Sequence, residues 1–165
     1  MGSNDLGKDY ARSYIVNNFR TNATILDVGA CDGKWRKLLP EYPNMDAVEA
    51  FGANAAKLMQ ANIYRSVFQA DIRDFQYEWY DLIIFGDVLE HLTVAQAQRV
   101  LEYAKPRCRD MIIAVPFLFE QDAIYGNPYE VHLQPDLTAE NFEERYHGFQ
   151  VMCTPAANYR YYRKG

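Results

Sequence analysis

Cysteine is scarce in this sequence. The 165 residues include three cysteines, Cys31, Cys108 and Cys153, and none of them belongs to a Cys-x-x-Cys pair. An odd number of scattered cysteines disfavours both a disulfide framework and a zinc site. His91 and His147 are also too distant in sequence to suggest a metal pair. We therefore expect a reduced intracellular protein that binds no metal.

Long hydrophobic runs are absent as well. No stretch reaches the roughly 18 consecutive apolar residues of a membrane span. Residues 1–19 lack the apolar core of a secretory signal peptide. The sequence therefore predicts no membrane partner, and the cytoplasm is the expected location.

Basic residues are fewer than acidic residues in this sequence. Lysine and arginine total 17 against 22 aspartates and glutamates, which gives a formal net charge of -5. Proteins that bind nucleic acid or anionic membranes use lysine and arginine to neutralise phosphates. Residues 160–164 form one basic stretch, but a basic end of this kind is usually a solvated edge. A nucleic-acid partner is therefore not expected.

Aromatic residues, in contrast, are plentiful. The chain has 13 tyrosines and 9 phenylalanines, and aromatics make up 15% of it. Two interpretations fit this composition: a tyrosine-rich core or an aromatic-lined pocket. The length suits a single domain over residues 1–165, which at this size buries roughly 70% of its unfolded surface.

Strand-like apolar runs alternate with helical stretches along the chain. Helices are predicted at residues 8–19, 33–39, 52–62, 93–105 and 138–146, and strands at residues 24–29, 45–51, 65–71, 80–88 and 110–117. This alternation predicts an α/β fold with right-handed βαβ units, in a doubly wound, mostly parallel sheet with helices on both faces. Two further strands at residues 148–156 and 158–165 predict a closing antiparallel hairpin and a seven-stranded sheet.

Threonines mark the starts of the last two predicted helices. Thr93 is the expected N-cap of the helix at residues 93–105. Thr138 is followed three residues later by Asn141 instead of glutamate, which predicts an incomplete capping box.

Acidic residues stand at the ends of four successive predicted strands, at Asp27, Glu49, Asp71 and Asp87. In open α/β sheets, ligands bind outside the carboxyl ends of the strands. One such acid is unremarkable, but four in chain order predict a binding site at this edge of the sheet.

The first strand leads into a turn that contains Gly29 and Gly33. The middle glycine of the dinucleotide pattern G-x-G-x-x-G is missing, and Asp27 and Asp32 would meet a pyrophosphate with like charge. The P-loop pattern fails too, because Trp35 follows Gly33-Lys34. A cationic cofactor fits better, since a carboxylate about 4 Å from a cation is worth up to roughly 4 kcal/mol before desolvation.

The stretches "LDVGACDG", "VEAF", "QADIRDF" and "YDLIIFGDVLEHL" together resemble the successive motifs of class I S-adenosylmethionine-dependent methyltransferases. The resemblance covers about residues 20–116. It implies a Rossmann-like methyltransferase fold, S-adenosyl-L-methionine as the cofactor and methyl transfer as the activity. The match departs from the family at Cys31, where glycine is commonest, and this puts the tight approach of the cofactor in doubt.

The resemblance also implies a role for each matching residue. The methionine part of the cofactor would lie against Asp27, Gly29, Ala30 and Gly33, its ribose against Glu49, its adenine against Ala50, Phe51, Asp71 and Ile72, and its methyl group near Gly86 and Asp87. Plainer roles stay open. Asp27 could satisfy donors of the turn, Glu49 could be a solvated strand end, and Asp71 could cap the turn after it. Trp35 is expected to pack rather than to contact the cofactor.

Three segments then divide the domain by role. Residues 1–22 form an N-terminal helical segment, residues 23–116 the cofactor-binding half, and residues 117–165 the acceptor side, with a loop, a helix and the closing hairpin. The loop at residues 117–137 contains Pro128 and Pro135, and loops of this length are usually functional or disordered.

Asp87, His91 and His132 are the candidate catalytic residues, because an alcohol or acid acceptor can use a general base. His91 could instead make a purely local bond at a helix start, and His132 could pack against the sheet. The short chain favours a small-molecule acceptor. The alternatives are an inactive cofactor-binding module that serves as a partner scaffold, and a nicotinamide-dependent reductase, for which the glycine pattern is missing.

Overall fold

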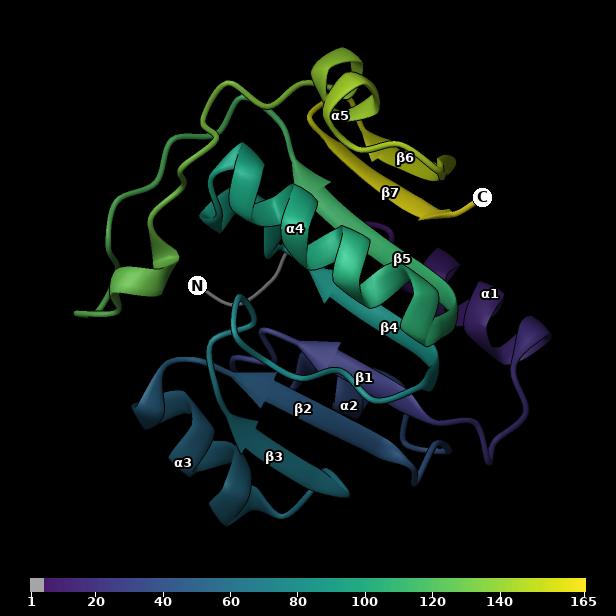
Figure 1. Ribbon diagram of the computed structural model, residues 1–165. Coiled ribbons are helices and arrows are strands. Elements are labelled where there is room, and N and C mark those ends of the chain that lie inside the picture. Colours follow the sequence, from purple (N-terminus) through teal and green to yellow (C-terminus); the bar gives the residue numbers. More distant parts are fainter. Residues whose placement is uncertain (1–4) are drawn as a thin grey trace.

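A seven-stranded sheet runs through the centre of the molecule (Figure 1). The computed structural model describes residues 5–165, so the first four residues of the predicted segment 1–22 lie outside the described residues. The spatial order of the strands is β3-β2-β1-β4-β5-β7-β6. Their bounds are β1 Ile25–Val28, β2 Met45–Glu49, β3 Ser66–Gln69, β4 Tyr80–Gly86, β5 Cys108–Pro116, β6 Phe149–Ala156 and β7 Tyr159–Lys164.

The first five strands are parallel and the last two are antiparallel. β1 lies between β2 and β4, and all its pairings are parallel. β7 is antiparallel to both β5 and β6, so the chain inserts its last strand beside β5 and leaves β6 at the edge. The predicted doubly wound sheet with a closing hairpin is confirmed.

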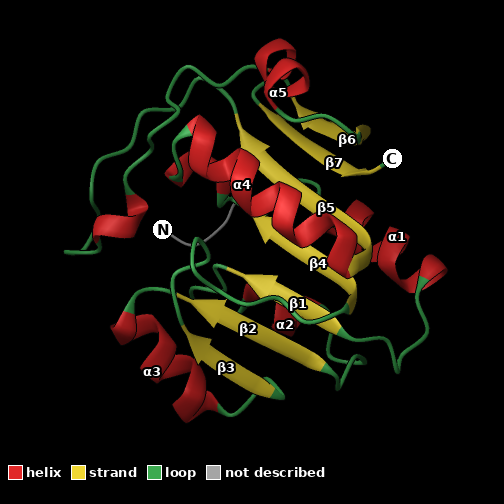
Figure 2. Ribbon diagram, viewed as in Figure 1, coloured by secondary structure: helices red, strands yellow, loops and turns green. Residues whose placement is uncertain are grey.

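Helices cover both faces of the sheet (Figure 2). Their bounds are α1 Lys8–Asn18, α2 Lys34–Leu38, α3 Gly52–Ala61, α4 Val94–Ala104 and α5 Ala139–Arg145, with short 3₁₀ turns η1 Leu89–His91, η2 Lys105–Arg107 and η3 Pro128–Glu130. Buried residues of α1, α2 and α3 belong to one hydrophobic core, and those of α4 and α5 belong to the other. No helix in the part of the chain that the structure describes is long and apolar enough to cross a membrane.

The central strand β4 shows how the sequence builds two cores. Its side chains alternate, because successive residues of a strand point to opposite faces. Ile83 and Phe85 lie in the core under α4, whereas Leu82 and Ile84 lie in the core under α1. A strand buried on both faces has a nearly continuous apolar sequence, which is why this segment is so hydrophobic.

Tyrosine is a core residue in this protein. Tyr42, Tyr159, Tyr161 and Tyr162 are among the largest fully buried side chains. The tyrosine-rich core is therefore confirmed, although Tyr159 also lines the cavity described below.

Threonine caps begin both late helices. Thr93 is the N-cap of α4, as predicted, and it also forms a capping box with Gln96. The prediction of an incomplete box at α5 is wrong. The Asn141 side chain accepts a bond of 2.7 Å from the Thr138 amide, and Thr138 Oγ1 accepts one from the Asn141 amide. A shorter amide therefore closes the box where glutamate or glutamine is usual.

Candidate cofactor and acceptor site

A cavity of about 910 Å³ lies at the carboxyl ends of the parallel strands. Its wall combines the ends of β1, β2, β4 and β5 with the loop at residues 117–137. This is the edge at which the strand-end acids predicted a site. The volume is within the usual range for small-molecule pockets, roughly 300–1,000 Å³.

The turn after β1 forms one wall through an unusual backbone. Gly29, Cys31 and Gly33 all have positive φ, at 68°, 49° and 76°. A β-carbon at Gly29 would lie 2.8 Å from a methyl carbon of Val88. Left-handed backbone favours glycine, so the preference for glycine at the position of Cys31 has a conformational cause. Burial raises the pKa of the Cys31 thiol to about 11, which leaves the sulfur uncharged.

Glu49 is bonded to the backbone of two turns. Its Oε2 accepts from the Cys31 amide at 2.8 Å and its Oε1 accepts from the Phe51 amide at 2.9 Å. The side chain is 6% exposed, so the interpretation of Glu49 as a solvated strand end is wrong. Burial raises the pKa of Glu49, and the two amide bonds oppose this shift. Each carboxylate oxygen keeps a second lone pair for a hydroxyl donor.

Asp27 lies beneath the turn and is 1% exposed. Its Oδ2 accepts a 2.5 Å bond from the Tyr64 hydroxyl, and its Oδ1 has no hydrogen-bond partner among residues 5–165. The plainer interpretation was that Asp27 accepts hydrogen bonds from the turn. Its donor is instead the Tyr64 hydroxyl. Burial raises the pKa of Asp27 to about 7, against the opposing effects of Tyr64 and the Lys8 charge.

Asp71 follows β3 and is bonded to its own turn. Its Oδ1 accepts from the Arg73 amide at 2.9 Å and from Arg73 Nε at 2.8 Å. The Arg73 guanidinium lowers the pKa of Asp71. The turn-capping interpretation is therefore confirmed, and a contact with adenine stays a prediction.

Gly86 and Asp87 end β4 in close contact with two aromatic side chains. A β-carbon at Gly86 would overlap the indole nitrogen of Trp35, which is 3% exposed. Trp35 therefore packs as expected. Asp87 has a φ of 56°, and its Oδ1 accepts a 2.6 Å bond from the Tyr159 hydroxyl of β7. The last strand of the sheet thus fixes an acid at the end of a central one.

His91 and His132 meet across the cavity wall. Their ring centroids are 4.7 Å apart and the ring planes are nearly perpendicular, at 74°. His91 Nδ1 lies 3.2 Å from the carbonyl oxygen of Val131, so the interpretation of a purely local bond is wrong. Burial and the neighbouring His132 lower the pKa of His91 to about 4, which leaves this imidazole neutral near pH 7.

The loop at residues 117–137 is tied together at its base. The His132 amide donates to the Gln121 carbonyl at 2.9 Å, and Gln121 Nε2 donates to the Glu130 carbonyl at 2.7 Å. The Leu133 amide donates to the Glu90 carbonyl at 2.8 Å. Backbone bonds therefore hold the position of His132 against η1, while the Tyr125 side chain at the tip is 91% exposed.

The fold has many relatives among solved structures. A methyltransferase dependent on S-adenosylmethionine from Clostridium acetobutylicum superposes with a TM-score of 0.75 at 14% identity, over 97% of this chain and 91% of that chain. A sugar N-methyltransferase from Streptoalloteichus gives 0.68 at 12% identity, over 97% and 87%. The plantazolicin methyltransferase BpumL in complex with SAH gives 0.68 at 13% identity, over 96% and 82%. The chain has the Rossmann-like methyltransferase fold.

Sequence comparison alone does not reach this conclusion. No family model matches the chain, and no curated protein matches it. The compared structures have this fold at only 11–14% sequence identity to the chain, so the likeness lies in the backbone and not in the sequence.

Most of the predicted site residues line the cavity of this methyltransferase fold. The residues that line it are Gly29, Glu49, Ala50, Asp71, Ile72, Gly86, Asp87, His91 and His132. Four predicted residues are not in its wall: Asp27, Ala30, Gly33 and Phe51. Asp27 and Ala30 are buried behind the turn, whereas Gly33 and Phe51 are the N-caps of α2 and α3.

The sequence analysis missed two side chains at this site, Glu90 and Tyr159, and a third behind it, Lys8, whose charge acts on Asp27 and Asp87. Glu90 is 1% exposed and lines the cavity beside His91. An acid inside the apolar run "DVLEHL" was the signal that could have drawn attention to it. Tyr159 and Lys8 come from opposite ends of the chain, and no local pattern distinguishes them from other buried tyrosines or surface lysines.

Proposed function

We propose that this chain is an S-adenosylmethionine-dependent methyltransferase that acts on a small-molecule acceptor. The observation that supports it most is the cavity at the carboxyl edge of a methyltransferase fold, with Glu49 and Asp87 in its wall. The neighbouring structures include a sugar N-methyltransferase and a plantazolicin methyltransferase. A small-molecule acceptor agrees with their names.

The residues present fit such a cofactor. Glu49 keeps lone pairs for the two ribose hydroxyls, since each of its oxygens accepts one backbone bond. The Oδ1 atom of Asp27 has no hydrogen-bond partner in the described chain, and the charged form of this acid, which predominates above its pKa of about 7, favours a cationic methionine group. Gly29 lines the cavity without a side chain, which allows close approach. The bound cofactor would supply an electrophilic methyl group.

Methyl transfer requires alignment of the two reactants more than it requires acid–base chemistry. Asp87 is held by Tyr159 at the end of β4, and His91 and His132 lie in the cavity wall. A neutral His91 is able to accept a proton from an acceptor hydroxyl, and the loop at residues 117–137 would exclude water from the reacting groups. These three residues remain the candidates for catalysis.

Calorimetry with S-adenosylmethionine and S-adenosylhomocysteine tests the first step, and methyl transfer across a panel of small acceptors tests the second. We expect both ligands to bind and at least one acceptor to be methylated. Absence of heat and of a thermal shift at millimolar ligand would overturn the proposal. Binding without turnover on any acceptor would favour the inactive module, for which the strained Cys31 in the turn is the supporting observation.

A cytoplasmic location stays a prediction, supported by three free cysteines.

A further inference from the structure

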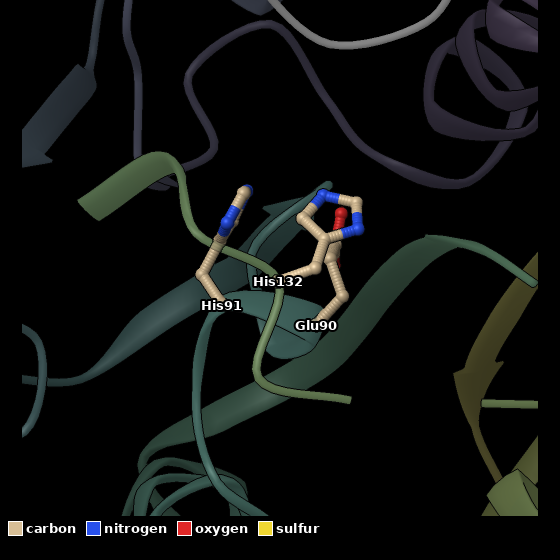
Figure 3. A group of neighbouring side chains, drawn as sticks. All are labelled: Glu90, His91 and His132. Atoms are coloured by element: carbon tan, nitrogen blue, oxygen red, sulfur yellow. The ribbon is translucent and has the colours of Figure 1, made fainter. Parts of the chain in front are cut away.

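Three side chains that can ligate a metal converge at one end of the cavity. Glu90 and His91 come from η1, and His132 comes from the loop that covers it (Figure 3). One ligand atom from each residue can be chosen so that all three lie within 4.8 Å of one another. The histidines are 41 residues apart in sequence, so only the fold brings them together.

The first observation that points to a bound ligand at this cluster is the environment of the Glu90 carboxylate. The residue is 1% exposed, and neither of its carboxylate oxygens has a hydrogen-bond partner among the other residues of the range 5–165. A buried polar group without a partner is costly, and a buried charge is more so. Apart from the amide of Glu90 itself, no described group donates to these oxygens, so a cation from outside the chain would compensate them.

The orientation of the histidines is the second, independent observation. His132 Nδ1 lies 2.8 Å from the Phe119 carbonyl oxygen, and His91 Nδ1 lies 3.2 Å from the Val131 carbonyl oxygen. A carbonyl oxygen only accepts, so Nδ1 carries the proton in both rings. Each Nε2 is then left with a free lone pair. Metal-binding histidines in general donate their other ring N–H to a carbonyl or carboxylate in this way.

The surrounding charge also favours a cation. Asp87 and Glu130 both act electrostatically on Glu90, which adds negative potential to that of the carboxylate itself. Glu130 belongs to η3, and its backbone carbonyl is held by Gln121. The three acids come from the residue after β4, from η1 and from η3 in the loop.

We propose that Glu90, His91 and His132 bind one divalent transition-metal ion at the acceptor end of the cavity. Two imidazoles and one carboxylate suit Zn²⁺, Co²⁺, Mn²⁺ or Fe²⁺, whereas Mg²⁺ and Ca²⁺ prefer ligand sets made only of oxygen. Three protein ligands leave coordination positions open, and all three residues line the cavity, so the open positions face it. This proposal departs from the expectation, drawn from the sequence, that the protein binds no metal.

The test is direct metal binding by the full chain without an affinity tag. The protein is treated with a chelator, dialysed, and titrated separately with Zn²⁺, Co²⁺ and Mn²⁺ by calorimetry. Visible absorption of the Co²⁺ form reports nitrogen ligation. We expect one ion per chain, and we expect His132→Ala and Glu90→Gln to weaken binding by about 100-fold or more, since loss of even an outer-shell partner costs about 10–100-fold.

His147→Ala is the matched control, because the chain has three histidines and His147 is exposed and outside the cavity. Its metal affinity is expected to equal that of the unmodified chain. The melting temperature of each variant without metal separates loss of a ligand from loss of the fold. Less than a tenth of an ion per chain, or affinity unchanged in a folded His132→Ala variant, would overturn the proposal. Metal binding and cofactor binding are measured separately, so either result stands alone.

Discussion

The hydroxyl of Tyr64 donates a 2.5 Å hydrogen bond to Oδ2 of Asp27, a carboxylate that is 1% exposed. Tyr64 lies in the turn between α3 and β3 and Asp27 lies in β1, so the bond joins this turn to the central sheet. It leaves the other oxygen of the acid without a partner within the described residues. The first two predictions concern this pair.

Asp27→Asn should remove a pH dependence of cofactor binding. The pKa of Asp27 is raised to about 7, so the carboxylate becomes charged as the pH rises through neutrality. A cationic cofactor favours the charged form, and its affinity should therefore rise between about pH 6 and pH 8. Calorimetry with S-adenosylmethionine measures this. The variant should show only the titration of the ligand itself, and parallel pH profiles for the two proteins would contradict the prediction.

The same pKa predicts how stability changes with pH. In the unfolded chain the carboxyl group loses its proton near its ordinary value of 3.8, whereas in the folded chain it keeps the proton to about pH 7. Because the native state binds more protons in this window, the free energy of unfolding decreases as the pH rises from about 4 to 7. Urea denaturation should show a steeper decrease for the unmodified chain than for Asp27→Asn, because Glu49, whose pKa burial also raises, still titrates in the variant. Equal slopes for the two proteins would assign the effect to other groups.

Glu49→Ala should weaken binding of S-adenosylmethionine and S-adenosylhomocysteine at least tenfold. Charge-assisted bonds from two ribose hydroxyls are worth roughly 1.5–3 kcal/mol each. The melting temperature should fall as well, because the amides of Cys31 and Phe51 lose their acceptor. Glu49→Gln should behave similarly, since its NH₂ group would face one of the two N–H donors.

The control for Glu49 is Glu144→Ala, which removes an exposed acid from α5. It should leave both affinity and melting temperature unchanged. A folded Glu49→Ala protein with unaltered affinity would show that the ribose binds elsewhere.

Gly86→Ala should destabilise the protein through one contact. The new β-carbon would overlap the indole nitrogen of Trp35, and overpacking a core costs about 1–3 kcal/mol. Gly52→Ala is the matched control, because its β-carbon meets only the flexible end of the Gln69 side chain. Thermal melting should therefore show a fall of several degrees for Gly86→Ala and none for Gly52→Ala. Equal melting temperatures would contradict the prediction.

His132→Ala should separate catalysis from cofactor binding. The predicted cofactor contacts come from the ends of the first four strands, so affinity for S-adenosylmethionine should stay within about threefold. Methyl transfer should fall by about 10²–10⁴-fold through loss of a proton acceptor or an acceptor contact or, with the proposed metal bound, through loss of one of its ligands. Single-turnover rates, once an acceptor is known, measure this beside the melting temperature. A variant with normal melting and a normal rate would refute the role of His132.

The order of strands and helices could be predicted from the sequence because its signals are local. The apolar run of β4 and the N-cap at Thr93 depend on neighbouring residues, and each element was predicted within a few positions. The common location of the strand-end acids could be predicted from the topology, since parallel strands bring their carboxyl ends to one edge. The α5 capping box was missed because the reach of Asn141 depends on the local backbone and not on residue type alone.

The partners of the site residues could not be predicted. Tyr159 bonds Asp87 across 72 positions, and Tyr64 bonds Asp27 across 37. No periodicity encodes such pairs, which depend on the register between strands and helices. Glu90 was overlooked for the same reason, because its burial without a partner is a property of the folded chain.

The bonds at the base of the loop also bear on how the proposed methyltransferase could change its substrate. Gln121 and Glu90 hold the chain on both sides of His132, whereas the exposed tip around Tyr125 carries none of these bonds. Residues 122–126 could therefore be lengthened or exchanged without displacing the groups beneath them. Duplicated copies of this gene could then diverge in the size of molecule they admit while the reacting groups stay fixed, and tip swaps between homologues are where we expect new specificities to arise.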